Sequence, residues 1–488
     1  MTDQKSRFVS DITPQSQDFP GWYNDVVLKT EMADYSPVRG CMVIRPYGYA
    51  MWESLRDQLD RYIKRTGHDN VYFPLFVPKS LLEKEAAHVE GFNPQVAWVT
   101  HAGGEELSEW LAIRPTSEAI IAEKVKDWVH SYRDLPLLFN LWNNVVRWEL
   151  RTRLFLRTTE FLWQEAHTFH ATEQEAADEV ATGLEGYRSA CEDWLAIPVI
   201  RGRKTDSEKF AGADYTHTIE AMMADKKALQ AGTSHMLGQN FAKAAGIEFL
   251  DRENKLQHPY GTSWGFTTRM IGAVVMVHGD DSGLVMPPNL APTQLVIVPI
   301  FRSEEDRRVV AEAIESVQKS LADVMTASGP LRVKVDWREE SPGFKYSHWE
   351  LRGVPYRLEI GPRDVASGSG VLVRRVDRDK QPIALTALAA ELPARLADYQ
   401  HSLFQRALDF RSANTHNADT YDEFKSILDT DGGFLLAPWC GSRECEKQVN
   451  ADTGATIRCI PFDSPDEAGK CLVDGKPSER RVLFARAY

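Results

Sequence analysis

Four short segments of the chain concentrate side chains that can bind charged ligands. Each combines arginine or histidine with glutamate, glutamine, threonine or aromatic residues, and together they cover residues 114–118, 147–149 with 157–167, 230–235 and 262–269. A guanidinium among apolar neighbours is costly to bury without an anionic partner, and its fork suits phosphate and carboxylate oxygens. We therefore expect Arg147, Arg157 and Arg269 to form a site for a ligand with several negative charges.

The glutamates interleaved with these arginines admit three roles. They could orient the arginines, recognise an ammonium group or hold Mg²⁺. The residues concerned are Glu118, Glu149, Glu160 and Glu165. A structural ion pair in a sheet explains any single Arg–Glu pair more simply, but the four segments together favour a binding site.

Familiar nucleotide and zinc motifs do not occur in this sequence. There is no G-x-x-x-x-G-K-[ST] loop and no G-x-G-x-x-G after a first strand, so we expect arginine rather than a backbone loop to hold any phosphate. The histidines lack the H-E-x-x-H spacing of a catalytic zinc site. His170 and His217 are predicted to be packed or surface residues, whereas His167 and His235 lie inside the dense segments.

The chain divides into three regions, and the first contains all four of these segments. In the first, strand-like runs at 135–150 and 161–170 and a helical stretch at 173–195 predict an α+β domain, an antiparallel sheet flanked by helices. In the second, strands at 294–300, 331–337 and 356–362 alternate with helices, which predicts an α/β domain. A helix from about residue 401 leads into a small, cysteine-containing α/β region. We place the domains at 1–290, 291–400 and 401–488.

Composition narrows the class of protein. With 488 residues, 43% apolar and 26% charged, the chain is typical of a folded protein with several cores. Its net charge of −13 argues against non-specific nucleic-acid adhesion, although residues 363–380 carry five cations against three acids and permit a selective contact. Six cysteines favour a reducing compartment, which predicts a cytoplasmic protein. No apolar run approaches the ~20 residues of a membrane span, so no membrane partner is expected.

Four motifs resemble those of a known family. R-W-E at 147–149, R-x-x-E-F-x-W-Q-E-x-H at 157–167, G-T-S-H-x-L-G-Q-N-F at 232–241 and S-W-G-x-x-T-R-x-I-G at 263–272 resemble class II aminoacyl-tRNA synthetases, and more narrowly prolyl-tRNA synthetases of the archaeal/eukaryotic type. The resemblance extends over essentially the whole chain. Residues 40–48 resemble the family's first motif, which builds a dimer interface, so a homodimer is implied. Ala166 stands where the family usually has glycine, and its methyl group would border the substrate pocket.

The resemblance implies roles for the residues of the dense segments. Arg147 and Arg269 would be catalytic, and Mg²⁺ would neutralise pyrophosphate. The implied proline site consists of Thr116, Glu118, Arg147, Trp163, Glu165, His167, Phe210 and His235. The implied ATP site consists of Arg147, Glu149, Arg157, Phe161, Gln230, Thr233, Thr267 and Arg269. Judged alone, Trp163 and Phe210 are more typical of a hydrophobic core.

The two later regions carry further implied sites. Residues 341–364 resemble the family's anticodon-binding domain, with candidate base contacts at Glu340, Lys345, Arg352 and Arg363. The implied zinc ligands are Cys440, Cys445, Cys471 and Asp474, where the last is often cysteine in the family; Cys459 is an alternative ligand, and a metal-free fold is an alternative to the site. The terminal Tyr488 would approach the catalytic domain.

The implied activity is ligation of proline to tRNA(Pro) with ATP as second substrate. A small apolar pocket rejects a missing methylene by only about 10–200-fold, so we expect some activation of alanine and cysteine. The segment between Arg157 and Arg269 is too short for the editing insertion of some family members, so no editing in cis is expected. The alternatives are a synthetase for another small amino acid and a non-catalytic RNA-binding relative, although Glu118 and the three arginines argue against the latter.

Overall fold

The computed structural model describes residues 12–88 and 95–488. Its first region is built on a long, largely antiparallel sheet of aromatic and β-branched strands. In spatial order these are β9 (Val199–Arg203), β10 (Tyr215–Met222), β11 (Ala228–Gly238), β14 (Tyr260–Thr267), β8 (Glu160–His170), β7 (Leu137–Val146) and the short parallel β3 (Asp69–Asn70). The strands expected at 135–150 and 161–170 correspond to β7 and β8.

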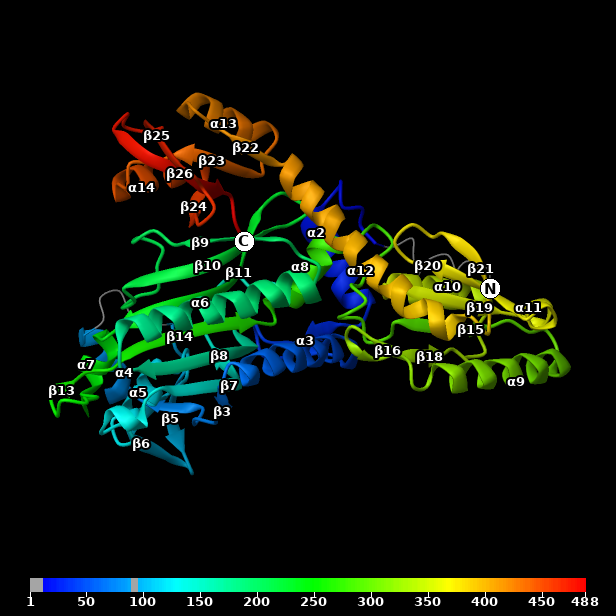
Figure 1. Cartoon of the computed structure of the whole chain (residues 1–488), viewed down its shortest axis with the longest axis horizontal. Helices are drawn as coiled ribbons and strands as arrows, with labels where there is room; N and C mark the ends of the chain where they lie inside the picture. Colours follow the sequence, from blue (N-terminus) through cyan, green and yellow to red (C-terminus); the bar gives the residue numbers. More distant parts are fainter. Residues whose placement is uncertain (1–11, 89–94) are drawn as a thin grey trace.

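Helix α6 (Glu173–Ser189) lies across one face of this sheet (Figure 1). It begins with a capping box, in which Thr172 accepts the Glu175 N–H and the Glu175 carboxylate accepts the Thr172 N–H. A π-helical turn (Ala190–Trp194) extends it to the end of the predicted helix. The approach is close because Gly183 has no side chain; a Cβ there would lie 2.6 Å from the Trp264 ring. The predicted α+β class is confirmed.

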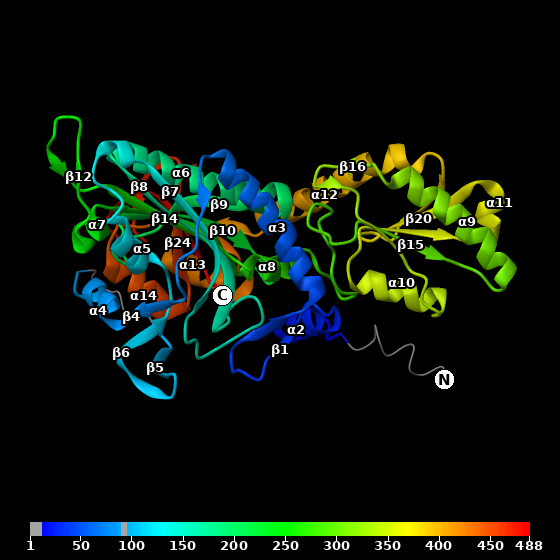
Figure 2. The ribbon, with the colours of Figure 1, turned by 90° about the horizontal axis from the view of Figure 1, so that it is seen from below.

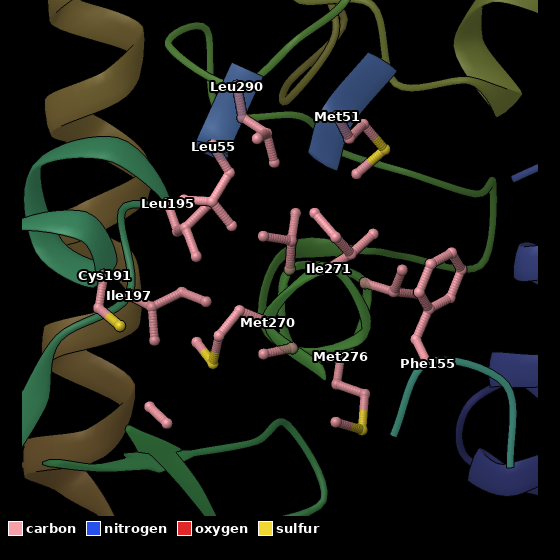
Figure 3. Close-up of a cluster of buried hydrophobic side chains, with 14 of the residues drawn as sticks. Met51, Leu55, Phe155, Cys191, Leu195, Ile197, Met270, Ile271, Met276 and Leu290 are labelled. Atoms are coloured by element: carbon pink, nitrogen blue, oxygen red, sulfur yellow. The ribbon is translucent and has the colours of Figure 1, made fainter. Parts of the chain in front are cut away.

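The apolar run after β14 forms helix α8 (Arg269–His278), which is buried on nearly all sides. Figure 3 shows Met270, Ile271 and Met276 of this helix within a cluster that includes Met51 and Leu55 of α3 (Pro46–Arg65). Because α8 is enclosed in this way, the position of its first residue, Arg269, is set by the core.

Smaller elements surround this core. A three-stranded sheet orders β4 (Phe76–Pro78), β6 (Glu105–Ile113) and β5 (Trp98–Ala102), and a two-stranded one pairs β1 (Ala33–Tyr35) with β2 (Met42–Ile44). The remaining helices are α2 (Phe19–Lys29), α4 (Lys79–His88), α5 (Glu118–Val125), the 3-10 turn Tyr132–Asp134 and α7 (Asn240–Ala245). The two-residue strands Phe249–Leu250 and Leu256–Gln257 pair with each other.

The second region is an α/β domain, as predicted. Its sheet orders β18 (Val333–Val335), β15 (Leu295–Pro299), β19 (Tyr356–Ile360), β20 (Ser369–Arg374) and β21 (Lys380–Ala384), of which the first three are parallel. Its helices are α9 (Glu304–Leu321), α10 (Pro342–Leu351) and α11 (Pro362–Ser367), and a short hairpin pairs Met325–Thr326 with Gly329–Pro330.

Helix α12 (Leu388–Ala413) joins the second region to the third and runs without interruption through residue 400 (Figures 1 and 2). It therefore starts earlier than the helix expected from residue 401. Pro393 lies inside it, although proline ordinarily ends or kinks a helix. The third region adds α13 (Tyr421–Thr430), α14 (Arg443–Thr453) and the strands β22 (Thr415–Asn417), β23 (Phe434–Pro438), β24 (Thr456–Pro461), β25 (Asp466–Lys470) and β26 (Pro477–Ala485).

The sheet of the third region continues the sheet of the first. Strand β24 pairs antiparallel with β9, with Ile460 opposite Arg203 and Pro461 opposite Gly202. The backbones approach closely, since a Cβ on Gly202 would lie 2.5 Å from the Ile460 carbonyl oxygen. Within the described residues, no helix is long and apolar enough to cross a membrane.

Candidate active site

A cavity of about 310 Å³ lies over strands β8, β11 and β14, and it gathers the dense segments found in the sequence. It is lined by every residue of the implied proline and ATP sites except Glu165. The strand period of two explains the arrangement on β8: Phe161, Trp163 and His167 face the cavity, whereas Gln164 accepts a hydrogen bond from Tyr187 of α6 on the other face.

Ala166 also lies on the α6 face of β8. It is fully buried and belongs to the same core cluster as Tyr187 and Trp264. The expectation that its methyl group borders the substrate pocket is therefore wrong, because adjacent residues of a strand point to opposite faces.

One end of the cavity is acidic and tightly hydrogen-bonded. The Thr116 hydroxyl donates to Glu118, the first residue of α5, and the Ser117 hydroxyl donates to Glu165. Glu165 also accepts from Asn143 Nδ2 at 2.8 Å, and its Oε2 lies 2.9 Å from Nε2 of His167. Glu165 does not line the cavity itself and contacts it through His167, which it orients.

His167 and His235, the two histidines of the cavity wall, differ in their electrostatic surroundings. Burial disfavours the protonated form of His167, but the hydrogen bond to Glu165 and the charge of Glu118 outweigh burial and raise its pKa. His235 differs, because burial and the charges of His167 and Arg147 lower its pKa to about 3. Its Nδ1 lies 2.9 Å from the Thr216 hydroxyl, which leaves a neutral ring.

His235 belongs to an apolar wall next to the acidic end. The rings of Phe210 and His235 are tilted with their centroids 4.6 Å apart. Trp163 donates its indole N–H to Asn143 Oδ1 at 2.5 Å, which fixes its ring over the cavity floor. A small hydrophobic ring that carries a positive charge would find complementary surfaces here.

The other end of the cavity is basic. Arg147 Nε–H donates to the Pro115 carbonyl at 3.0 Å, and Arg269 Nε–H donates to the Leu156 carbonyl at 3.0 Å. Within residues 12–88 and 95–488, their terminal nitrogens make no hydrogen bond, so both outer edges remain for a ligand. Arg157 at the rim is 57% exposed and pairs with Glu149 at 2.7 Å.

The three guanidiniums influence one another. Burial, followed by the charges of Arg147 and Arg157, lowers the pKa of Arg269 to about 10. Arg147 also lies 5.5 Å from the centroids of both the Phe161 and the Trp163 ring. An anionic ligand would relieve the convergence of these guanidiniums on one cavity.

Some residues of the cavity wall were not expected from the sequence. Ser263 and Gly265 alternate with Thr267 along β14, and that period could have indicated them. Lys204, Glu208 and Thr216 lie in or beside the loop between β9 and β10, and no sequence signal marks them.

Two of the four anticodon candidates have partners within the fold. Lys345 is only 2% exposed and donates its Nζ to the Asp336 carbonyl at 3.0 Å. Arg352 pairs with Glu31, far away in the sequence, and lies over the Tyr47 ring. Glu340 and Arg363 are exposed, and both follow the carboxyl ends of parallel strands at one edge of the second sheet.

The implied metal ligands come together. One donor atom from each of Cys440, Cys445, Cys471 and Asp474 lies within 4.8 Å of the others. Cys440 Sγ is 3.7 Å from both Cys445 Sγ and Asp474 Oδ2. Zinc–sulfur bonds of about 2.3 Å in a tetrahedron place sulfurs about 3.8 Å apart, so these residues fit zinc. Cys459 is buried in another cluster, against Gly202, and is not an alternative ligand.

The chain terminus reaches the first region. The Tyr488 hydroxyl donates to Asp225 Oδ2 at 2.6 Å, and its ring lies 5.8 Å from the guanidinium of Arg153 in the loop between Arg147 and Arg157. The expectation that Tyr488 approaches this region is confirmed.

The antiparallel sheet with its arginine-lined cavity defines a class II aminoacyl-tRNA synthetase. Residues 98–278 match the family model described as tRNA synthetase class II core domain (G, H, P, S and T), and residues 294–395 match the one described as anticodon binding domain. Residues 421–488 match the one described as prolyl-tRNA synthetase, C-terminal. The chain belongs to the proline–tRNA ligase family and is an aminoacyl-tRNA ligase.

Relatives match over the full length. The proline–tRNA ligase of Chlorobium phaeobacteroides (strain BS1) is 54% identical, with 98% of this chain and 99% of the relative covered. That of Ruminiclostridium cellulolyticum is 51% identical, with 99% of each covered. A crystal structure of prolyl-tRNA synthetase from Cryptosporidium parvum, complexed with halofuginone and AMPPNP, superposes with a TM-score of 0.91 at 39% identity and covers 98% of this chain and 96% of its own.

Proposed function

We propose that this chain activates L-proline with ATP to prolyl-adenylate and transfers the prolyl group to the 3′ end of tRNA(Pro), releasing pyrophosphate and then AMP. The observation that carries the proposal is the convergence of three guanidiniums on a cavity whose other end joins a carboxylate to an apolar wall.

The acidic end suits the amino acid. Glu118 binds the secondary ammonium of proline, with the Thr116 hydroxyl beside it. Trp163, Phe210 and the neutral His235 enclose the ring. His167 completes the wall and is held by Glu165. The carboxylate of proline then points toward Arg147.

The basic end suits the nucleotide. Arg147 bridges the proline carboxylate and the α-phosphate, while Arg157 and Arg269 bind the outer phosphates. Phe161 and Arg269 enclose the adenine, and the remaining polar contacts come from Gln230, Thr233 and Thr267. Glu149, which lines the cavity and pairs with Arg157, would hold Mg²⁺ through its carboxylate, and the ion would supply positive charge to the phosphates.

The geometry assists the reaction by positioning and electrostatics. A carboxylate oxygen of proline attacks the α-phosphorus, the bond to the pyrophosphate oxygen breaks, and two anions must meet in line. The guanidinium of Arg147 offsets their repulsion. Its side chain does not have to move first, because its Nε–H already donates a hydrogen bond to the Pro115 carbonyl. In the second step a terminal hydroxyl of tRNA attacks the prolyl carbonyl and AMP leaves.

The accessory regions serve the tRNA, the metal and the partner subunit. We assign the three functional units to 1–290, 291–400 and 401–488. Glu340 and Arg363 contact the anticodon, since both are exposed at one edge of the sheet. The Cys440 cluster holds a structural zinc ion.

A homodimer through the first motif is supported by exposed apolar residues there. Tyr35 is 62% and Val43 is 47% exposed, on the paired strands β1 and β2. The tRNA substrate, together with six cysteines that form no disulfide, supports a cytoplasmic location.

Selectivity against smaller apolar side chains rests on pocket size. Alanine and cysteine fit wherever proline fits and lose only the contacts of the missing atoms, so both are activated at reduced efficiency. No separate site hydrolyses the mischarged tRNA in cis.

Proline-dependent exchange of pyrophosphate into ATP tests the proposal directly. We expect exchange to be far more efficient with proline than with threonine or serine, and Arg147→Ala to lower the proline-dependent rate at least about 10²-fold. Exchange that ran faster with threonine or serine, or that kept its wild-type rate in Arg147→Ala, would contradict the assigned chemistry.

A further inference from the structure

The loop between β9 and β10 is attached on one side to the cavity and on the other to the third region. Its residues Lys204, Glu208 and Phe210 line the cavity. On the opposite side, Lys204 and Thr205 contact side chains or backbone of β24 and α14, which lie more than 200 positions later in the chain. This loop is therefore shared by the two regions.

The first attachment is a fully buried group of three charges. Glu220 on β10 is 0% exposed, and its Oε1 accepts from Lys204 Nζ at 2.8 Å, while its Oε2 accepts from Arg458 Nε at 3.0 Å. Lys204 Nζ also donates to the Arg458 carbonyl at 2.8 Å. The group combines two basic side chains with one acidic side chain, and its geometry fixes the side chain of Lys204, a residue that lines the cavity.

The second attachment runs through Thr205. Its hydroxyl donates to Oε1 of Glu446 on α14 at 2.8 Å, and both groups are buried. The Thr205 carbonyl accepts the backbone N–H groups of Glu208 and Lys209 at 3.1 and 2.9 Å, which closes the turn. One residue later, the N–H of Phe210 donates to the Thr216 hydroxyl that also contacts His235. Hydrogen bonds, together with the backbone of residues 205–210, thus connect Glu446 to the apolar wall.

We infer that Arg458 and Glu446 are positioning residues of the proline pocket, which act through Lys204 and Thr205 on the loop that carries Phe210. The third region then contributes to amino-acid binding without touching the amino acid. This inference deepens the proposed function and rests on it, because it takes the apolar wall to be the proline site.

Two substitutions separate positioning from folding. Arg458→Met leaves Lys204 and Glu220 as a balanced buried pair, whereas replacing Glu220 would leave two buried cations. Thr205→Val keeps the shape of the side chain and removes only the hydroxyl that holds Glu446. Matched controls are Arg480→Met, whose partner Asp466 is exposed, and Thr430→Val, on the exposed face of α13. Arg458→Lys retains the positive charge.

Two readouts follow the loop and the pocket separately. In both variants we expect hydrogen exchange at the amides of Glu208, Lys209 and Phe210 to accelerate about tenfold or more, because their hydrogen-bonded turn opens more often. In pyrophosphate exchange, the KM for proline should rise about tenfold while kcat stays within about twofold. Arg458→Lys should lie between the wild type and Arg458→Met, and the controls should match the wild type.

These measurements distinguish failure of the inference from failure of the proposed function. Unchanged amide exchange in folded Thr205→Val overturns the inference, even if Arg458→Met fails to fold. Faster exchange with an unchanged KM for proline also overturns it, because the loop would then be held without effect on the pocket. A wild-type chain that shows no proline-dependent exchange refutes the proposed function instead, and the amide exchange still reports whether the third region holds the loop.

Discussion

Glu165 and His167 lie on the same face of β8, with Oε2 of the carboxylate 2.9 Å from Nε2 of the imidazole, and both are buried. Each therefore stabilises the charged form of the other beside the proposed proline pocket. Burial opposes both charges, yet the pKa of His167 is raised above its ordinary 6.5 and that of Glu165 is lowered below its ordinary 4.5.

This pair predicts a pH-dependent stability. His167 contributes fully below 6.5 and loses its contribution as pH rises through its raised pKa, while Glu165 contributes fully above 4.5 and loses its contribution as pH falls through its lowered pKa. Glu165→Gln should therefore cost about 1–3 kcal/mol of unfolding free energy near pH 5.5 and less near pH 9. Urea unfolding at both pH values measures it, and an equal cost at both would contradict the coupling.

Arg147 is predicted to be essential for chemistry and dispensable for folding. Its side chain faces the cavity and, among the described residues, its one hydrogen bond goes to the Pro115 carbonyl. The nearby carboxylates of Glu118 and Glu165 keep their hydrogen bonds to Thr116, Ser117 and Asn143 when Arg147 is removed. Arg147→Ala should lower kcat of adenylate formation by about 10²–10³-fold or more with an unchanged unfolding midpoint. Arg147→Lys should rescue it poorly, since a single ammonium cannot bridge two anions. Arg151→Ala, outside the cavity lining, is the control and should retain wild-type rates.

The pocket is predicted to accept alanine and cysteine. Each missing methylene costs about 10–200-fold in kcat/KM, so both amino acids should support pyrophosphate exchange at reduced efficiency. Incubation of the chain with preformed Ala-tRNA(Pro) should give no hydrolysis above the spontaneous rate. Enzymatic release of alanine would refute the absence of editing in cis.

The purified protein is predicted to contain one zinc ion per chain. Cys445→Ser removes a ligand and should abolish the metal content, while Asp474→Cys completes a four-thiolate set and should retain it. Elemental analysis of both variants, with Cys41→Ser outside the cluster as control, measures the content. Wild-type protein that folds with no bound zinc after expression in zinc-supplied medium would rule out the site.

The exposed apolar surface around the first motif, residues 40–48, is predicted to form the interface of a homodimer. Tyr35→Asp combined with Val43→Asp places two charges on this apolar face and should yield monomers in sedimentation equilibrium. Met325→Asp, an equally exposed apolar residue of the second region, should remain dimeric. A monomeric wild-type chain at micromolar concentration would argue against the assigned interface.

Much of the candidate active site could be predicted because its residues fall in a few short motifs, each of which lies within one strand or loop. Alternation along β8 and β14 presents Phe161, Trp163 and Thr267 to one face, and a period of two needs no tertiary information. The same rule, applied to Ala166, would have placed its methyl group on the far side of the sheet. The partners of the anticodon candidates Lys345 and Arg352 could not be predicted, since a distant partner of a charged residue is known only once the fold brings the two together.

Local chemistry was thus determined by the sequence itself: which segments carry arginine, and which face of each strand they share. The tertiary structure brought Asp474 rather than Cys459 to Cys440, Cys445 and Cys471. Only the tertiary structure decided that Lys204 meets Arg458 and that Glu31 meets Arg352, pairs separated by 254 and 321 positions. Periodicity extends over a few residues of one strand or helix, whereas contacts between distant segments depend on how whole elements pack, and no local pattern encodes that choice.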